Sequence, residues 1–127
     1  QGGLGALRKI KQARELLLAA ERIDATTLDG SVYTSLGSLY AKSPGWPIAF
    51  GDKDKAAEYL RRALAINPQG IDPNFFYGEL LLEQGDVSGA KRHFQAALAA
   101  SPRPGRKDAD SGRRMEVQDA LRQLPPD

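Results

Sequence analysis

The sequence of 127 residues predicts an all-α fold, in which helical hairpins stack into a right-handed solenoid and a C-terminal helix caps the end. Three observations predict this fold. One set of residues recurs after 34 positions, apolar residues follow helical spacing, and a proline closes each recurring segment.

The recurring set occupies two segments that align without a gap. The first contains Gly51, Asp52, Ala56, Leu60, Ala63, Leu64 and Pro68, and the second contains Gly85, Asp86, Ala90, Phe94, Ala97, Leu98 and Pro102. Glycine and aspartate are suited to a turn and to the N-cap of the helix that follows. The alanines allow close helix packing, the large residue packs between helices, and the proline ends the helix.

A second set of residues precedes each of these turns, and its two copies are 41 residues apart. Tyr33, Leu36, Gly37 and Tyr40 form one copy, and Asn74, Tyr77, Gly78 and Leu81 form the other. The offset exceeds 34 by seven residues, so the earlier hairpin carries an insertion between its helices. We place the insertion in residues 43–50, where two prolines and a glycine prevent a regular helix.

Together these residues resemble the tetratricopeptide repeat family, whose pattern has an aromatic, Leu-Gly and Tyr in the first helix and Ala, a large residue, Ala and Pro in the second. The departures are Asn74 in place of an aromatic, Tyr77 in place of Leu and Leu81 in place of Tyr. The resemblance implies first helices that line a concave groove for a protein or peptide, and second helices that form the outer wall.

Residues 2–7, 29–40, 44–47 and 50–52 are also similar to a group of uncharacterised proteobacterial proteins of this family. Members of that group typically carry an export signal and a further upstream helical segment. The resemblance therefore implies a periplasmic protein, or a cytoplasmic one if the native chain has no export signal.

The residue pattern predicts helices over about 4–23, 31–42, 53–66, 73–84, 87–100 and 108–123. They belong to a single domain, 1–127. Residues 1–25 are the second helix of a truncated repeat, 30–69 are the repeat with the insertion, 70–103 are the next repeat, and 106–124 are the capping helix. Asp29 or Ser31, Asp72 and Asp86 are the expected N-caps.

Composition excludes several kinds of site. The chain has no cysteine, a single histidine and a net charge of +2, and no apolar run long enough to cross a bilayer. His93 is expected at the surface, with no serine, cysteine or paired acid placed to work with it. The basic residues around Arg103 and Arg113 are interrupted by acids and are expected in a solvated cap with local ion pairs. We therefore expect no catalysis, cofactor, metal, nucleic acid or membrane insertion.

Candidate partner-binding residues are those of the first helices that point away from the hairpin core, together with the insertion's tryptophan. They are Thr34, Ser38, Trp46, Phe75, Phe76, Glu79 and Leu82. At least one of Phe75 and Phe76 is expected in the groove, but both could instead pack against the insertion or an adjoining helix. Trp46 could anchor a partner, although packing over its own hairpin is favoured.

The leading functional interpretation is a protein–protein interaction scaffold, which the family resemblance places in a bacterial envelope complex. Two alternatives stay open. One is a structural module that forms a homodimer through the open edge of the solenoid. The other is a small-solute-binding partner of a transporter, with the insertion near Trp46 as a lid.

Overall fold

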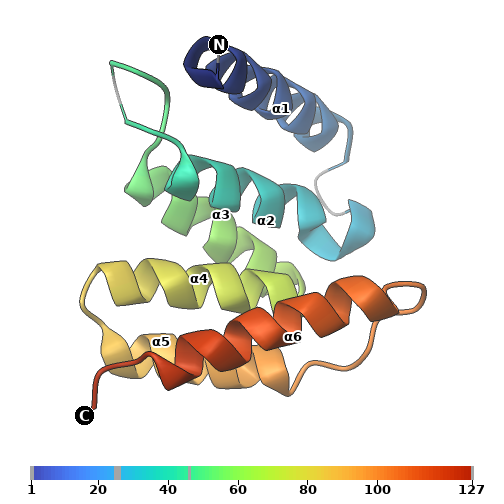
Figure 1. The fold of residues 1–127 in the computed structure, drawn as a ribbon. Coiled ribbons are helices and arrows are strands. Elements are labelled where there is room, and N and C mark those ends of the chain that lie inside the picture. Colours follow the sequence, from blue (N-terminus) through green and yellow to red (C-terminus); the bar gives the residue numbers. More distant parts are fainter. Residues whose placement is uncertain (1, 25–26, 46, 127) are drawn as a thin grey trace. The chain divides into compact units, whose positions relative to one another are not determined.

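The computed structural model describes residues 2–24, 27–45 and 47–126, with the backbone alone for residues 2, 23, 24 and 27–29. Within these ranges six helices follow one another and no strand forms (Figure 1). The helices are α1 (Gly2–Asp24), α2 (Thr27–Lys42), α3 (Lys53–Ile66), α4 (Ile71–Glu83), α5 (Val87–Leu98) and α6 (Lys107–Arg122). The predicted all-α class is confirmed.

The chain divides into two compact units. The N-terminal unit, Gln1–Ile66, contains α1 to α3, and the C-terminal unit, Asn67–Asp127, contains α4 to α6. The division lies close to the predicted repeat boundary after residue 69. Each unit contains one helical hairpin, α2 with α3 or α4 with α5, and one further helix.

Both hairpins are joined by the same contact between a glycine and a large apolar residue. A Cβ atom at Gly37 would lie 2.6 Å from Cγ of Leu60, and one at Gly78 would lie 2.6 Å from Cε1 of Phe94. Leu60 and Phe94 are fully buried, and burial of each side chain contributes about 1.5–3 kcal/mol to stability. The missing glycine side chain therefore allows the two helices to approach each other.

Alanines flank each of these large residues and also lie in the core. Ala56 and Ala63 on α3, and Ala90 and Ala97 on α5, have no exposed surface. Small side chains at these positions keep the helix surface flat beside the large residue, so the neighbouring helix can lie close to it. The predicted small–large–small packing is confirmed in both hairpins.

The predicted caps of the two second helices are also confirmed. The backbone N–H of Lys55 donates to Oδ1 of Asp52 over 3.0 Å, and that of Gly89 donates to Oδ1 of Asp86 over 2.9 Å. The prediction that Asp72 caps α4 is wrong. That helix has Gly70 as its N-cap, with no side-chain cap, so Asp72 falls in the first turn.

The insertion between α2 and α3 closes through backbone contacts. The N–H of Gly51 donates to the carbonyl of Pro44 over 2.7 Å, and the N–H of Asp52 donates to that of Tyr40 over 3.0 Å. A Cβ atom at Gly51 would lie 1.9 Å from the carbonyl oxygen of Ser43, which no real side chain tolerates. Glycine at this position therefore lets the loop return to the start of α3.

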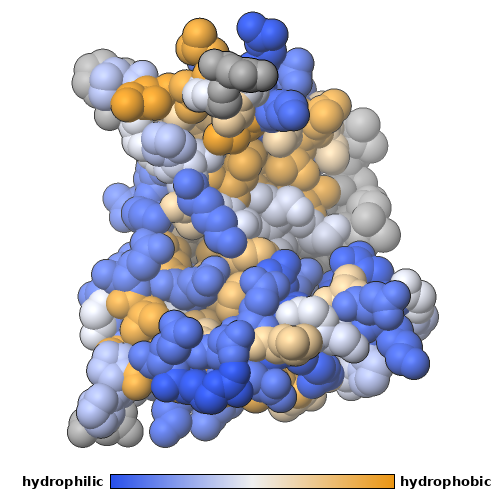
Figure 2. All heavy atoms as spheres, in the orientation of Figure 1, coloured by the Kyte–Doolittle hydropathy of each residue, from blue (hydrophilic) through white to orange (hydrophobic). Residues whose placement is uncertain are grey.

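The C-terminal helix α6 covers one side of the α4–α5 hairpin. Val117 is fully buried with Ile71, Phe75 and Phe94, and Leu121 and Leu124 pack against the same cluster. The part of α6 that faces the viewer in Figure 2 is mostly hydrophilic. An apolar inner side and a polar outer side are what a capping helix requires.

We predict that Gly51→Ala destabilises the N-terminal unit by about 1–3 kcal/mol, because the added Cβ atom displaces the backbone of Ser43. Gly45→Ala is the matched control within the same loop. Its Cβ atom would have its nearest neighbour at an ordinary 3.7 Å, so stability should change by less than about 0.5 kcal/mol. Urea unfolding followed by circular dichroism measures both variants. Equal stability of the two would contradict this account of the loop.

Candidate partner-binding surface

The predicted partner-binding residues differ in their exposure in the structure. Thr34 and Phe75 are 7% and 3% exposed. Ser38, Phe76, Glu79 and Leu82 are partly exposed, and Leu82 packs against the C-terminal core. Trp46 lies outside the described residues. Thr34 and Phe75 therefore do not present their side chains to a partner in this structure. Burial of Thr34 differs from the expectation, and burial of Phe75 is one of the alternatives that the sequence left open.

Phe75 is a core residue because α6 packs beside α4. Its ring centroid lies 6.0 Å from that of Phe94, and both rings belong to the cluster that includes Val117 of α6. The sequence left open whether the phenylalanines face a groove or pack against an adjoining helix. For Phe75 the structure shows packing against the adjoining helix.

Phe76 retains partial exposure, and its position is fixed by an arginine of α6. The guanidinium carbon of Arg113 lies 4.7 Å from the Phe76 ring centroid and 5.1 Å from that of Phe75. Such cation–π contacts contribute about 0.5–2 kcal/mol. Asp72, Phe76, Glu79 and Glu83 are separated by four, three and four positions, so they share one side of α4. We call these four residues the α4 stripe.

Arg113 is itself held by two carboxylates. Its Nε donates to Oδ1 of Asp72 over 2.9 Å, and its Nη1 donates to Oε1 of Glu116 over 3.0 Å. Arg103 approaches the other Asp72 oxygen, with 3.5 Å between Nη1 and Oδ2. Asp72 thus joins α6 and the segment before it to the first turn of α4.

A second carboxylate completes this network. Arg103 donates from Nε to Oδ1 of buried Asp110 over 2.7 Å, and from its backbone N–H to Oδ2 over 3.0 Å. The side-chain hydrogen bonds from Arg103 hold the pKa of Asp110 below its usual value. Burial alone would lower the pKa of Arg103, but its bonds and charge interactions with Asp110 and Asp72 outweigh burial and raise it.

The predicted ion pairs of the cap are confirmed for Arg103 with Asp110 and for Arg113 with Glu116, but the prediction that the cap is solvated is wrong for three of its arginines. Arg103, Arg113 and Arg114 are all partly buried. Arg114 donates to the carbonyl of Leu98 over 2.5 Å and to that of Ala100, so it satisfies carbonyl groups at the end of α5. These arginines bind the capping helix to the hairpin. Sequence spacing could not predict these contacts, because the partners lie up to 41 positions away.

Comparison with known proteins identifies the repeats. The family model described as tetratricopeptide repeat matches residues 48–107, which include α3, α4 and α5. Residues 48–107 are thus identified as tetratricopeptide repeat sequence. No curated protein matches the sequence. Tetratricopeptide repeats generally mediate protein–protein interaction, and proteins of the family are typically non-catalytic scaffolds.

Asn74 stands where a tetratricopeptide first helix usually has an aromatic residue. In this structure the asparagine forms hydrogen bonds. The side chain is buried, and its Nδ2 donates to the carbonyls of Pro68 and Gly70 over 3.0 and 2.8 Å. Its Oδ1 lies 2.8 Å from Nδ1 of His93. Because Oδ1 can only accept, Nδ1 of His93 must be the protonated nitrogen. Asn74 therefore ties α5 to the turn before α4.

His93 is partly buried, whereas the sequence placed it at the surface. Its ring meets that of Tyr77 edge-on, with 4.9 Å between centroids. Burial lowers the pKa of His93, the charge of Arg92 lowers it further, and Asp86 opposes the shift. The neutral ring is thus a structural part of this tetratricopeptide hairpin.

Tyrosines stabilise the α2–α3 hairpin of the N-terminal unit. The ring of Tyr59 on α3 stacks against Tyr33 and Tyr40 of α2, with centroids 5.9 and 5.7 Å apart. Phe50 of the insertion meets Tyr40 edge-on at 5.3 Å. Burial, followed by the charge of Glu21, raises the pKa of Tyr59. The insertion therefore packs back onto its own hairpin through Phe50.

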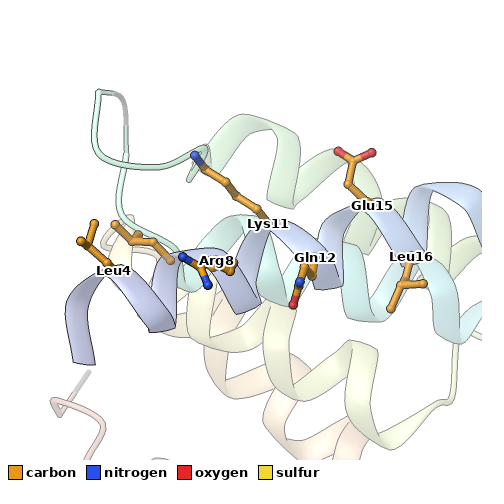
Figure 3. Close-up of a pocket in the computed structure, with 7 residues that line it drawn as sticks. Leu4, Arg8, Lys11, Gln12, Glu15 and Leu16 are labelled. Carbon is orange, nitrogen blue, oxygen red and sulfur yellow. The ribbon is translucent and has the colours of Figure 1, made fainter. Parts of the chain in front are cut away.

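A hollow runs along the outer side of α1 (Figure 3). It is lined by Leu4, Leu7, Arg8, Lys11, Gln12, Glu15 and Leu16. All of these residues belong to one helix, so the hollow is open to one side and is no enclosed solute pocket. In the described ranges no helix is both long and apolar enough to cross a membrane, and no group of acidic or histidine side chains is arranged to hold a metal ion.

We predict that the stability of the C-terminal unit falls as the pH drops from about 7.5 to 5.5. The folded pKa of His93 lies below that of the unfolded chain, about 6.5. The unfolded chain therefore binds more protons in this range, so stability is complete above the unfolded pKa and is lost as the pH falls toward the folded one.

His93→Gln should remove this dependence, because glutamine can still donate to Asn74 but does not titrate. His93 is the only histidine of the chain, so chemical denaturation at a series of pH values isolates its contribution. The same slope in the wild type and the variant would be inconsistent with a buried neutral His93.

Proposed function

We propose that this tetratricopeptide protein is a non-catalytic interaction module that binds a peptide or protein segment along the α4 stripe. The observation that carries the proposal is the arrangement of Phe76. Its ring is partly exposed, yet Arg113 stacks on it and Asp72 holds Arg113 in place. An aromatic side chain that is ordered before binding loses little conformational entropy in a complex, which suits it to anchor a partner.

The charges of α4 indicate the chemistry of the partner. The helix carries Asp72, Glu79 and Glu83 and no lysine or arginine. Asp72 is engaged by arginines of its own unit. A fitting segment would place an apolar side chain against Phe76 and would carry basic residues that complement the net acidic charge of α4. The same charges disfavour a clamp for a C-terminal carboxylate, which needs basic residues.

Two parts of the proposal rest on sequence alone. Ser38 of α2, which is partly exposed, is proposed from its sequence position to contact a partner in the N-terminal unit. The role in a bacterial envelope complex and the periplasmic location follow from the resemblance to exported proteobacterial proteins.

Selection of peptides from a randomised display library by the immobilised protein tests the proposed site directly. We expect enriched peptides with an apolar residue close to lysine or arginine. Phe76→Ala should weaken their binding about tenfold or more, which is typical of a central aromatic anchor. Met115→Ala is the matched control, because Met115 is a 66% exposed apolar residue on α6 and its sequence position places it on the side away from Arg113.

Circular dichroism should show that both variants remain folded. Selected peptides that bind Phe76→Ala as tightly as the wild type would show that the α4 stripe is not the binding site. Loss of binding in Met115→Ala to the same extent would show that the effect is not specific to Phe76.

A further inference from the structure

The N-terminal unit carries its charge unevenly, with an excess of basic residues in two segments. Residues 2–13 and 42–55 together contain six basic and two acidic residues, which is a formal net charge of +4. Elsewhere in the unit there are four basic and five acidic residues, a net charge of −1. We call residues 2–13 and 42–55 the basic end. Its basic residues are Arg8, Lys9, Lys11, Lys42, Lys53 and Lys55.

The two segments of the basic end lie at the same end of the unit because of the direction in which α1 runs. The guanidinium carbon of Arg14 lies 4.3 Å from the ring centroid of Phe50. Further along both helices, Glu21 of α1 lies 3.6 Å from Arg62 of α3. The helix α1 therefore runs in the same direction as α3. Its residues before Arg14 extend toward the end where the insertion joins α2 to α3 (Figure 1).

Two large apolar side chains are exposed at this end. Leu4 in the first turn of α1 is 78% exposed, and Ile48 in the insertion is 61% exposed. The closed loop holds Ile48 in place, since its N–H donates to the carbonyl of Gly45 over 3.1 Å. Its neighbour Phe50 instead packs inward on Tyr40. Exposed apolar side chains among basic residues indicate a binding surface.

The lysines at the start of α3 make contacts that leave their charge in place. Lys53 donates to the carbonyl of Ala41, and Nζ of Lys55 lies 5.6 Å from the ring centroid of Tyr40. A carbonyl or a ring orients an ammonium group without neutralising it. The nearby carboxylate of Asp52 is used as the cap of α3. The basic end therefore has a positive potential.

The form of this end suits a broad anionic surface. Leu4, Arg8 and Lys11 line the hollow of Figure 3, which belongs to one helix and is open to one side, so it cannot enclose a chain segment. Nucleic-acid bases stack on exposed aromatic rings. The described aromatic residue of the basic end, Phe50, packs on Tyr40. Exposed aliphatic side chains next to basic ones are instead what a lipid surface binds.

We propose that the basic end docks onto the surface of an anionic lipid bilayer. Leu4 and Ile48 enter the boundary between headgroups and acyl chains, and the lysines and arginines around them contact lipid phosphates. The net charge of +4 complements the negative charge of such a surface. Two apolar side chains with a few basic residues give reversible binding. The contact is peripheral and needs no membrane-spanning helix.

Co-sedimentation of the whole chain with lipid vesicles tests the proposal. We expect binding to vesicles of phosphatidylcholine mixed with phosphatidylglycerol. Binding to vesicles of phosphatidylcholine alone should be about tenfold weaker or less, and high salt should weaken binding to the anionic vesicles similarly. Trp46 is the only tryptophan of the chain and belongs to the insertion sequence, so its fluorescence should shift to the blue when the vesicles bind.

Two variants should weaken this binding about tenfold or more, namely Leu4→Glu and the double variant Lys9→Glu, Lys11→Glu. Leu16→Glu is the matched control for Leu4→Glu, because Leu16 is 72% exposed on the same helix. It lies 12 positions further along, which is about 18 Å and exceeds the Debye length of about 8 Å at physiological salt. Leu16→Glu should therefore bind as the wild type does, and circular dichroism should show all variants folded.

Equal binding to neutral and anionic vesicles would overturn the proposal, and so would an equal loss in Leu4→Glu and Leu16→Glu. Failure to bind anionic vesicles would also overturn it. Salt-sensitive binding of polyglutamate or duplex DNA in that case would assign the surface to an acidic protein or to nucleic acid. Phe76 lies in the C-terminal unit, so Phe76→Ala should bind vesicles normally, and the test of the proposed function is independent of this one.

Discussion

The close approach of a glycine to a large apolar side chain is the contact on which each hairpin depends. Gly37 faces Leu60 and Gly78 faces Phe94. In both pairs a Cβ atom added to the glycine would lie only 2.6 Å from a carbon of the large side chain. This contact sets the distance between the two helices, and the distance allows the flanking alanines to be buried. Hydrogen bonds such as that of Asn74 to His93 form only at this helix separation.

The two ends of the chain differ in how they use this arrangement. In the C-terminal unit, α6 covers the hairpin with Val117 inside and with arginines that bind Asp72 and the end of α5. That cover leaves Phe76 partly exposed and fixed. In the N-terminal unit, α1 packs against α2 and leaves Leu16 exposed.

Local signals in the sequence were enough to predict the two hairpins. Gly85 and Asp86 marked a turn and a cap, and the 34-residue offset placed Phe94 in the core before any contact was known. The candidate partner-binding surface could not be predicted from such local signals. The exposure of Phe76 and burial of Phe75 depend on where α6 lies, and the pair of Arg113 with Asp72 joins positions 41 residues apart. Helical spacing carries no information on such distant partners.

The most direct test of the central contact compares two glycine-to-alanine substitutions by urea unfolding of the C-terminal unit. Gly78→Ala should destabilise it by about 1–3 kcal/mol, because the new Cβ atom collides with Phe94. Gly112→Ala on α6, where no atom lies within 4 Å of the added Cβ, should stabilise it by about 0.5–1 kcal/mol through helix propensity alone. Opposite signs are the predicted result. Stabilisation by both substitutions would contradict the account.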